Sequence, residues 1–397
     1  MRILFFTQHF WPENFRINEV VKFFSKKDHD IKVLTCDPSY PSKIKFKNFY
    51  DNNKKYKYYG SVEVLRVPII ARKFTNLSIV LNYITFLVSS FFLGFYKIFF
   101  KKFDIIFIFS TSPILSAIPA ILIKKILRKK IVIWVLDLWP NTIIDLGFIK
   151  NKLVIKIMKK LVKFIYDNSN LIVVQSHSFK KEIKKITKTE CFYISSWPEE
   201  IAASKKKIRS KKIKELKVLF AGNIGEAQSF ESMIECAKIL KGKGLVKWVI
   251  VGDGRWKSKL KNLIKDNDLK EDFQLFNSVP LSEMTSIFDY ADVLFLSLKN
   301  KEIYKKTIPG KLYTYMSTGK PILGMISGEA NKIIKKSNCG FVCEADDFQA
   351  LKDNIIKFNK LNKHDIKILG DNGKSYANKN FNKLKILNDI EKKLLEL

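Results

Sequence analysis

PGKLYTYMSTGKP, residues 309–321, predicts a helix between two buried strands. The apolar run ADVLFLSL precedes it at 291–298, and the run PILGMI follows it at 321–326. Two strand-like runs separated by a helical stretch form an α/β unit of a parallel sheet. The segment therefore predicts an α/β protein.

The residue pattern within 309–321 supports this interpretation. Leu312, Tyr315 and Met316 recur at helical spacing. Pro309 suits a first helical turn, and Gly319 is placed where a left-handed residue ends a helix. We expect a helix that begins just after the carboxyl end of a strand.

Ligands of open α/β sheets bind at that edge, and a helix N-terminus offers unpaired N–H groups to an anion. Gly310 lets a ligand approach the backbone, and Lys311 adds a positive charge. A phosphate group is the expected ligand. The alternative is a core helix that carries a solvated lysine.

The segment 309–321 resembles the P-S-K-L-x-E-Y-M-A-x-G-K-P signature of glycosyltransferase family 4, whose members have the GT-B fold. The resemblance implies two Rossmann-like parallel-sheet domains with an interdomain cleft. We expect an N-terminal, acceptor- and membrane-facing domain at 1–197, a basic linker at 198–215 and a nucleotide-sugar domain at 216–380. A final helix at 381–397 is expected to pack back toward the N-terminal domain.

Length and composition agree with a folded, multidomain chain. The 397 residues suffice for two or three domains, and 47% of them are hydrophobic. The five cysteines are scattered and no signal peptide is recognisable before the first strand, which favours the cytoplasm. Cys339 and Cys343 lack further ligands at zinc spacing, so a zinc site is disfavoured.

The net charge of +34 fits a polyanionic partner, anionic lipid or a lipid-linked phosphate. The alternative is compositional, because many lysines can be ordinary solvated surface. We expect no nucleic-acid partner, since no recognition motif accompanies the charge.

The N-terminus predicts a β-α-β unit, with strands at 2–7 and 31–35 and a helix at 17–27. The loop after the first strand, WPENFR at 11–16, lacks the glycine fingerprint of dinucleotide-binding enzymes. It resembles the Y-F-x-P-E-x-x-R-x-x-E-L segment of a family 4 subgroup that makes bacterial surface polysaccharides with amino or deoxy sugars. By that resemblance Glu13 is a catalytic candidate, and Asn14 and Arg16 face the acceptor or phosphates; the alternative is a capped helix start.

Residues 74–96 contain no charged residue and are long enough to span a bilayer. Strands predicted before the run (62–67) and after it (105–109, 131–136) must share a sheet, which argues against one crossing. We expect a helix in the membrane interface, flanked by cations; burial under the sheet and spanning are the alternatives. The flanking cations are Arg72, Lys73, Lys97, Lys101 and Lys102.

KIVIWVLDLWPNTIIDLG at 130–147 predicts a buried strand followed by Asp137 and Trp139. A carboxylate at the end of an apolar strand needs a partner or a function. The stretch resembles the V-x-D-L-W-P segment of the same subgroup, which implies a catalytic Asp137 near the acceptor hydroxyl or donor sugar and Trp139 on the acceptor side. The alternative is that Asp137 caps the following helix.

The second domain begins with KVLFAGNIGEAQSF at 217–230, whose strand-to-helix turn is suited to a diphosphate. It resembles the subgroup's G-N-x-G-x-x-Q loop. A second such turn is VGDG at 251–254. The family usually has paired glutamates where this chain has Lys306 and Thr314, so the carboxylates that typically bind the donor sugar and the ribose hydroxyls are missing here. The expected donor-binding residues are Gly222, Asn223, Gly225, Gln228, Asp253, Arg255, Thr307, Gly310, Lys311, Leu312 and Thr314.

The resemblance implies a retaining glycosyltransferase that uses a nucleotide-sugar donor, with UDP as the expected carrier. The implied acceptor is a saccharide on polyprenyl diphosphate, at the inner face of the cytoplasmic membrane. No D-x-D sequence occurs, so we expect neither metal nor cofactor. The alternatives are a GT-B nucleotide-sugar epimerase, an inactive nucleotide-sugar-binding partner and a basic binding module.

Overall fold

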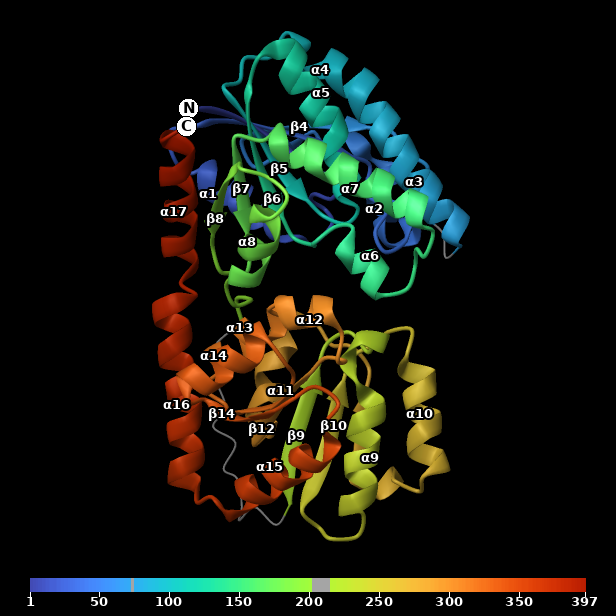
Figure 1. Cartoon of the computed structure of the whole chain (residues 1–397), viewed down its shortest axis with the longest axis vertical. Coiled ribbons are helices and arrows are strands. Elements are labelled where there is room, and N and C mark those ends of the chain that lie inside the picture. The colour runs from blue at the N-terminus through green and yellow to red at the C-terminus, as the bar shows by residue number, and fades with distance from the viewer. Residues whose placement is uncertain (73–74, 202–214) are drawn as a thin grey trace. The chain divides into compact units, whose positions relative to one another are not determined.

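The computed structural model describes residues 1–72, 75–201 and 215–397, which form two compact units (Figure 1). Unit 1 contains Met1–Ile194 and Leu387–Leu397, and unit 2 contains Ser195–Ile386. Lys73, Phe74 and most of the expected linker, residues 202–214, lie outside the described residues. Each unit is built around its own sheet, which confirms the predicted fold class of two parallel-sheet α/β domains.

The sheet of unit 1 has eight strands in the order β3-β4-β2-β1-β5-β6-β7-β8. Only the edge pair β3 and β4 is antiparallel. Strands β1, β5, β6 and β7 are almost wholly buried, as expected of a parallel sheet with helices on its faces. The strands are β1 Arg2–Phe6, β2 Asp30–Cys36, β3 Tyr58–Tyr59, β4 Val62–Val67, β5 Ile105–Ser110, β6 Lys130–Val135, β7 Leu171–Val174 and β8 Glu190–Tyr193.

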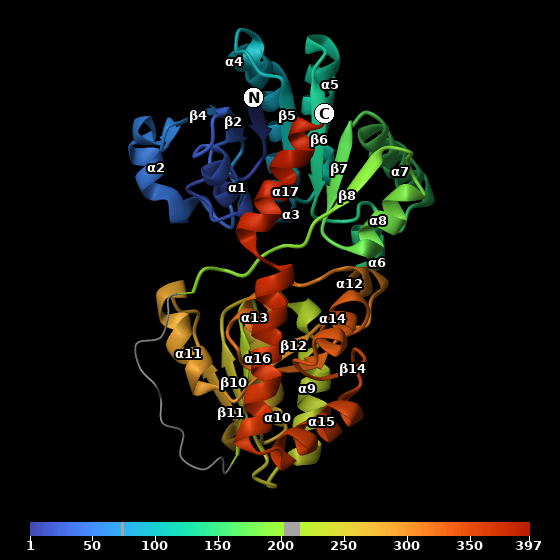
Figure 2. The same cartoon turned by 90° about the vertical axis from the view of Figure 1, so that its left-hand side faces the viewer.

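Helices cover both faces of this sheet (Figures 1 and 2). The uncharged run begins as helix α3, continues through one π-helical turn at Ser90–Gly94 and ends in α4. Residues 105–123, which are also uncharged, form a strand, a turn and the first part of a helix. The helices are α1 Arg16–Phe24, α2 Lys47–Asp51, α3 Asn76–Ser89, α4 Phe95–Phe99, α5 Ile118–Leu127, α6 Asn141–Asp145, α7 Lys152–Asp167 and α8 His177–Lys184.

The chain end contributes to unit 1 through helix α17, Lys383–Leu395. Glu391 Oε1 lies 2.8 Å from His29 Nε2, and Glu391 Oε2 lies 3.3 Å from Lys27 Nζ. Lys393 Nζ lies 3.3 Å from Glu190 Oε1. These pairs attach the last helix beside α1 and β8.

The sheet of unit 2 is parallel throughout, in the order β11-β10-β9-β12-β13-β14. This is the Rossmann order, in which the chain changes direction between the two central strands. The strands are β9 Leu216–Ala221, β10 Val246–Val251, β11 Phe273–Phe276, β12 Val293–Ser297, β13 Ile322–Met325 and β14 Gly340–Cys343. The helices are α9 Phe230–Leu240, α10 Lys257–Asp266, α11 Met284–Tyr290, α12 Glu302–Lys306, α13 Gly310–Ser317, α14 Glu329–Ser337, α15 Phe348–Lys360 and α16 Lys363–Asn380.

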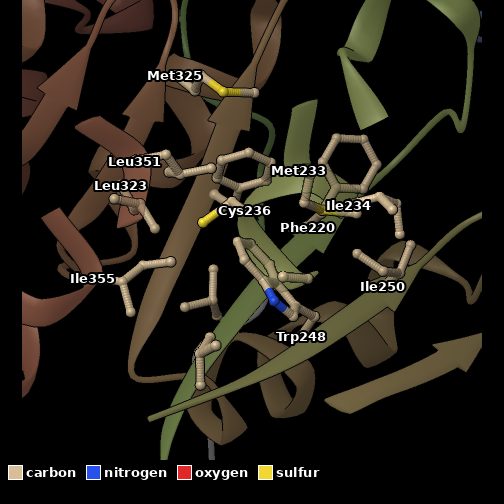
Figure 3. Close-up of a cluster of buried hydrophobic side chains, with 14 of the residues drawn as sticks. Phe220, Met233, Ile234, Cys236, Trp248, Ile250, Leu323, Met325, Leu351 and Ile355 are labelled. Carbon is tan, nitrogen blue, oxygen red and sulfur yellow. The ribbon is translucent and has the colours of Figure 1, made fainter. Parts of the chain in front are cut away.

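Two apolar clusters hold unit 2 together, one on each face of its sheet. Phe220, Trp248 and Leu351 belong to the cluster drawn in Figure 3, between the sheet and α9 and α15. Leu312, Tyr315 and Met316 belong to the other, where α13 packs on the sheet and α16 packs on α13 (Figure 2). The helical spacing predicted for the 309–321 segment is therefore confirmed, with Pro309 as the N-cap residue and Gly319 at φ +75° after the last turn.

The strand orders determine which loops lie at the carboxyl edge of each sheet, next to its central strands. In unit 1, β1 lies between β2 and β5; in unit 2, β9 lies between β10 and β12. The connections that follow β1 and β5, and those that follow β9 and β12, leave the sheet in opposite directions. A crevice at the carboxyl edge of an α/β sheet opens at such a point. The segments 7–16 and 222–229 both follow a central strand there.

Candidate functional site

The start of helix α13 has the properties of an anion site. Its N-cap, Pro309, makes no side-chain hydrogen bond to the helix. A Cβ added to Gly310 would meet no atom within 4 Å, so the backbone of the first turn faces open space. Unpaired amides at a helix N-terminus carry partial positive charge and attract a phosphate.

Lys311, the second residue of α13, has its ammonium inside the unit. Its Nζ lies 3.8 Å from the ring centroid of Phe220 and donates to Gln228 Oε1 at 3.2 Å. No carboxylate pairs with it among the residues that the structure describes. Burial lowers the pKa of the Lys311 ammonium to about 7. A lysine held beside a sheet edge without a counter-ion is poised to receive an anionic ligand.

Gly222 makes room for this lysine. A Cβ at Gly222 would lie 2.6 Å from Lys311 Cε, closer than side-chain atoms approach. Tyr315 fixes the other side of the helix, because its hydroxyl accepts from the amide of Ala221 at 2.9 Å and donates to the carbonyl of Ala221 at 3.1 Å. These contacts fix the end of β9 relative to the first turns of α13.

The two glycine turns of unit 2 pack against each other. A Cβ at Gly252 would lie 1.9 Å from the carbonyl oxygen of Gly222, and one at Gly254 would lie 2.2 Å from that of Ile224. The amide of Gly222 donates to Val251 O at 2.9 Å, and the amide of Ile224 donates to Asp253 O at 2.8 Å. The expectation that this turn offers its amides to a diphosphate is therefore wrong for these two residues, whose N–H groups join the turns.

The other candidates of these turns are placed differently. Asn223 and Arg255 are exposed, and Arg255 has no ion-pair partner in the described parts of the chain. The half-buried Gly225 accepts from the amide of Gln228 at 3.2 Å. Asp253 accepts from the amide of Gly254 at 2.8 Å, and its side chain is 69% exposed. A ligand near α13 has Arg255 as an available cation from this edge.

Three candidates on α13 and before it have protein contacts. Leu312 is fully buried in the core, so its side chain packs rather than binds. Thr307 donates to Ile303 O at 2.9 Å. Thr314 Oγ1 accepts from the amide of Glu199 at 3.1 Å. A glutamate from a separate segment therefore lies beside the position where the family usually has one.

In unit 1 the loop after β1 is organised by Glu13. This carboxylate is buried, lies 2.7 Å from His9 Nδ1 through Oε2, and accepts from the amides of Ser39 and Tyr40 at 2.7 and 2.6 Å through Oε1. His9 stacks on Phe15 with ring centroids 4.8 Å apart. The alternative of a capped helix start is wrong for Glu13, since α1 has no side-chain cap and Glu13 holds two loops together.

Asp137 follows β6 at the same edge of the sheet. Its carboxylate has no hydrogen-bond partner among the described residues, and burial raises its pKa. The alternative, a cap on the next helix, is wrong, because α6 begins at Asn141 with Pro140 as N-cap and no side-chain cap. Trp139 donates its indole N–H to Ser112 Oγ at 2.8 Å. Asp137 remains a carboxylate without a structural task.

Two further candidates of the N-terminal loop lie near its surface. Asn14 is exposed, and Arg16, half-buried, opens helix α1 with its guanidinium 3.9 Å from Glu19. They share the 11–16 loop with Glu13, whose side chain is buried more deeply.

Helix α3 and its continuation carry their apolar residues on the outside. The buried stripe is small or polar at four of its six positions, at a spacing of four: Ser78, Asn82, Phe86, Ser90, Gly94 and Ile98. The exposed side carries large apolar residues, with Leu77 69% and Phe92 65% exposed. Leu77–Phe99 is the one helix in the described chain that is long and apolar enough to cross a membrane. Strand β4 before this helix and strand β5 after it belong to one sheet. The exposed apolar side of the helix therefore lies on the surface of unit 1.

Comparison with known proteins shows which family the sequence of unit 2 resembles and which proteins the chain is similar to. Residues 202–375 match the model of the family described as glycosyl transferases group 1. They are a group 1 glycosyl transferase domain. The chain is 24% identical over 286 residues to a probable glycosyltransferase, WbjE of Pseudomonas aeruginosa, covering 68% of this chain and 69% of the relative. It is 23% identical to WcaI of Escherichia coli, a putative colanic acid biosynthesis glycosyl transferase, over 80% of this chain and 82% of the relative.

Solved structures extend the likeness of this glycosyl transferase to both units. HepE of Anabaena in complex with UDP superposes with a TM-score of 0.72 at 14% identity, and both chains are covered completely. The lipopolysaccharide outer core galactosyltransferase WaaB has a TM-score of 0.66 at 14% identity, again over the whole of both chains. At these identities the likeness establishes the GT-B fold, as the sequence predicted.

Sequence reasoning missed three residues of this glycosyl transferase. His9 stands four residues before Glu13 in a loop, a spacing that was a usable signal. Asn82, an amide in an apolar run, was another, because buried amides require partners. Tyr315 was recognised only as a core position, and its two hydrogen bonds to Ala221 depend on the fold.

Proposed function

We propose that the chain transfers a sugar from a nucleotide diphosphate donor to a lipid-linked saccharide in the synthesis of a bacterial surface polysaccharide. The observation that carries the proposal is Lys311, a buried lysine at the uncapped start of α13 that has no counter-ion among the described residues. A diphosphate supplies the missing charge. The UDP bound in HepE supports a uridine carrier, and the relative WcaI supports a polysaccharide product.

In the proposed reaction Lys311 and the first amides of α13 stabilise the charge that develops on the departing diphosphate. Arg255 adds a cation from the neighbouring turn. Asp137 accepts a hydrogen bond from the acceptor hydroxyl, which fits a carboxylate that has no hydrogen-bond partner in the described parts of the chain. Glu13 acts as a positioning residue, because His9 and the amides of Ser39 and Tyr40 already occupy its oxygens. A metal-independent reaction with retention of configuration stays a prediction.

Membrane attachment is part of the proposal. The exposed apolar side of α3 and α4 suits the acyl-chain boundary of a bilayer. Helix α7 exposes Leu153, Val154 and Ile157 among lysines, which suits anionic headgroups. The proposal therefore includes a peripheral location on the inner face of the cytoplasmic membrane.

The first test is thermal unfolding of the purified chain with a panel of UDP-, GDP-, dTDP- and CMP-sugars. A ligand at 100 times its Kd adds about 2.7 kcal/mol to the free energy of unfolding, which raises Tm measurably. We expect one nucleotide to do so, with a UDP-linked amino or deoxy sugar as the best ligand. Absence of any shift contradicts the proposal. NMR of the transferred sugar then reports the anomeric configuration.

An inactive nucleotide-sugar-binding partner is the second candidate. It is favoured by Lys306 and Thr314, which replace the family's glutamates, and by the use of the Thr314 hydroxyl to hold Glu199. Donor binding without transfer to any lipid-linked saccharide supports this candidate. A nucleotide-sugar epimerase is distinguished by turnover of the donor in the absence of acceptor.

A further inference from the structure

A groove of about 630 Å³ lies on unit 1, between the segment that follows β2 and the segment that precedes α3. Its walls combine cations with apolar surface. Ser42, Lys43, Ile44, Lys47 and Tyr50 come from the first segment, and Ala71 and Arg72 from the second. None of these residues belongs to the nucleotide site proposed on unit 2, so the groove needs its own explanation.

Arg72 is positioned by contacts with Asn82 and two tyrosine rings, none of which neutralises its charge. Its Nε donates to Asn82 Oδ1 at 3.1 Å. Its guanidinium lies 4.7 Å from the ring centroid of Tyr83 and 5.3 Å from that of Tyr40. Throughout residues 1–72, 75–201 and 215–397, no carboxylate forms an ion pair with Arg72, Lys43 or Lys47. Three positive charges around one groove, none of them in an ion pair within the described chain, favour an anionic ligand.

The same groove has an apolar side that faces water. The Ile44 side chain is 82% exposed and that of Ile70, beside Ala71, is 47% exposed. Lys43 Nζ lies 4.1 Å from the ring centroid of Tyr50, so the aromatic ring also supports the cation. The exposed apolar stripe of α3 begins at Leu77, five residues after Arg72. A ligand that joins a charged head to a hydrocarbon chain satisfies both kinds of wall.

We propose that this groove binds the diphosphate and the first isoprenoid units of the lipid that carries the acceptor saccharide. The inference rests on the proposed function, which supplies a lipid-linked acceptor, and it adds where the lipid head is recognised. Lys43, Lys47 and Arg72 bind the phosphates, while Ile44 and Ala71 contact the hydrocarbon.

The groove is also connected to the loop after β1. Asn82, which orients Arg72, donates from Nδ2 to Ser39 Oγ at 3.2 Å. The amide of Ser39 donates to Glu13 at 2.7 Å. One network of side chains thus fixes the lipid-head groove and the loop that carries Glu13, so a saccharide attached to a bound diphosphate starts near this edge of the sheet.

The test uses farnesyl diphosphate, a water-soluble isoprenoid diphosphate, in calorimetric titrations of the full chain. Saturating UDP is present so that the nucleotide site is filled. We expect saturable binding, weaker by about tenfold or more in Lys43→Gln/Lys47→Gln, because two charged contacts are lost. The control Lys54→Gln/Lys55→Gln removes the same charge from exposed lysines outside the groove and should bind as the wild type does. Equal affinity in both variants overturns the proposal.

A second variant separates the head from the chain. Ile44→Ser should weaken binding of farnesyl diphosphate and leave binding of inorganic diphosphate unchanged, since Ile44 contacts hydrocarbon only. If inorganic diphosphate binds as tightly as farnesyl diphosphate, the groove is an anion site and the proposal fails. Displacement of farnesyl diphosphate by equal concentrations of short-chain phosphatidylglycerol assigns the groove to bulk lipid and also overturns it.

These outcomes are independent of the donor. If the Tm responds to a nucleotide sugar but farnesyl diphosphate does not bind, the proposed function stands and the proposal for this groove fails. If farnesyl diphosphate binds in the groove but no nucleotide sugar shifts the Tm, the transferase proposal fails and the groove proposal stands.

Discussion

The aliphatic chain of Lys311 passes over Gly222, at a distance that leaves no space for a methyl group on that glycine. The two residues belong to different α/β units of the same sheet, and the contact joins the turn after β9 to the first turn of α13. The absence of a side chain at residue 222 therefore determines where the lysine ammonium lies.

Gly222→Ala should weaken donor binding by displacing Lys311. Gly222 has φ +130°, so the substitution also strains the backbone, by about 1 kcal/mol. Gly244→Ala is the matched control, because Gly244 has φ +61° and open space around it. We expect both variants to lose similar stability and only Gly222→Ala to lose the Tm shift given by the nucleotide sugar. Equal shifts in the two variants would exclude the contact from the donor site.

Donor binding should take up a proton. Because burial lowers the pKa of Lys311 to about 7, the ligand-free lysine is mostly neutral at pH 8.5, and a bound diphosphate favours its charged form. Calorimetry at pH 8.5 in buffers of different ionisation enthalpy should reveal uptake of nearly one proton per nucleotide sugar, fading toward pH 6. Lys311→Met should bind weakly and without this uptake. A binding enthalpy that does not depend on the buffer would show that Lys311 is not at the diphosphate.

Asp137 and Glu13 should respond oppositely to removal of their charge. Burial raises the pKa of Asp137, so between the unfolded and the folded pKa the folded chain binds more protons than the unfolded chain. The free energy of unfolding therefore falls as pH rises through this range, because the buried carboxyl group loses its proton. Asp137→Asn should therefore raise Tm at pH 7 while transfer is lost. Glu13→Ala should lower the free energy of unfolding by about 2–4 kcal/mol, because it leaves two buried donors and one partly buried donor unpaired. Thermal unfolding at pH 7 checks both, and an active Asp137→Asn would remove Asp137 from the reaction.

The exposed stripe of α3 should determine membrane binding. Val80→Ser/Ile84→Ser removes two half-exposed apolar side chains, which should lower partition into anionic vesicles about tenfold or more. Ile368→Ser/Leu384→Ser changes two exposed residues of unit 2 and should leave partition unchanged. Vesicle sedimentation at several salt concentrations measures both. Equal loss in the two variants would mean that partition is nonspecific.

The sequence predicted most of the fold because each parallel strand is a short apolar run bounded by turn residues. It predicted Lys311 at a helix start for the same local reason. It did not predict that the ammonium is buried, because this depends on Gly222, Phe220 and Gln228, which are some eighty to ninety residues away. It assigned Glu13 to chemistry, whereas the amides that Glu13 accepts from, at Ser39 and Tyr40, become neighbours only when β2 pairs with β1.

The inverted arrangement of α3, with Ser78, Asn82 and Ser90 inside and Leu77 and Phe92 outside, has a consequence for the chain away from a bilayer. A contiguous apolar face of this kind associates with itself in water. Overproduced chain that exceeds the available membrane area is therefore expected to oligomerise through α3, and detergent or lipid added at lysis should keep it monodisperse.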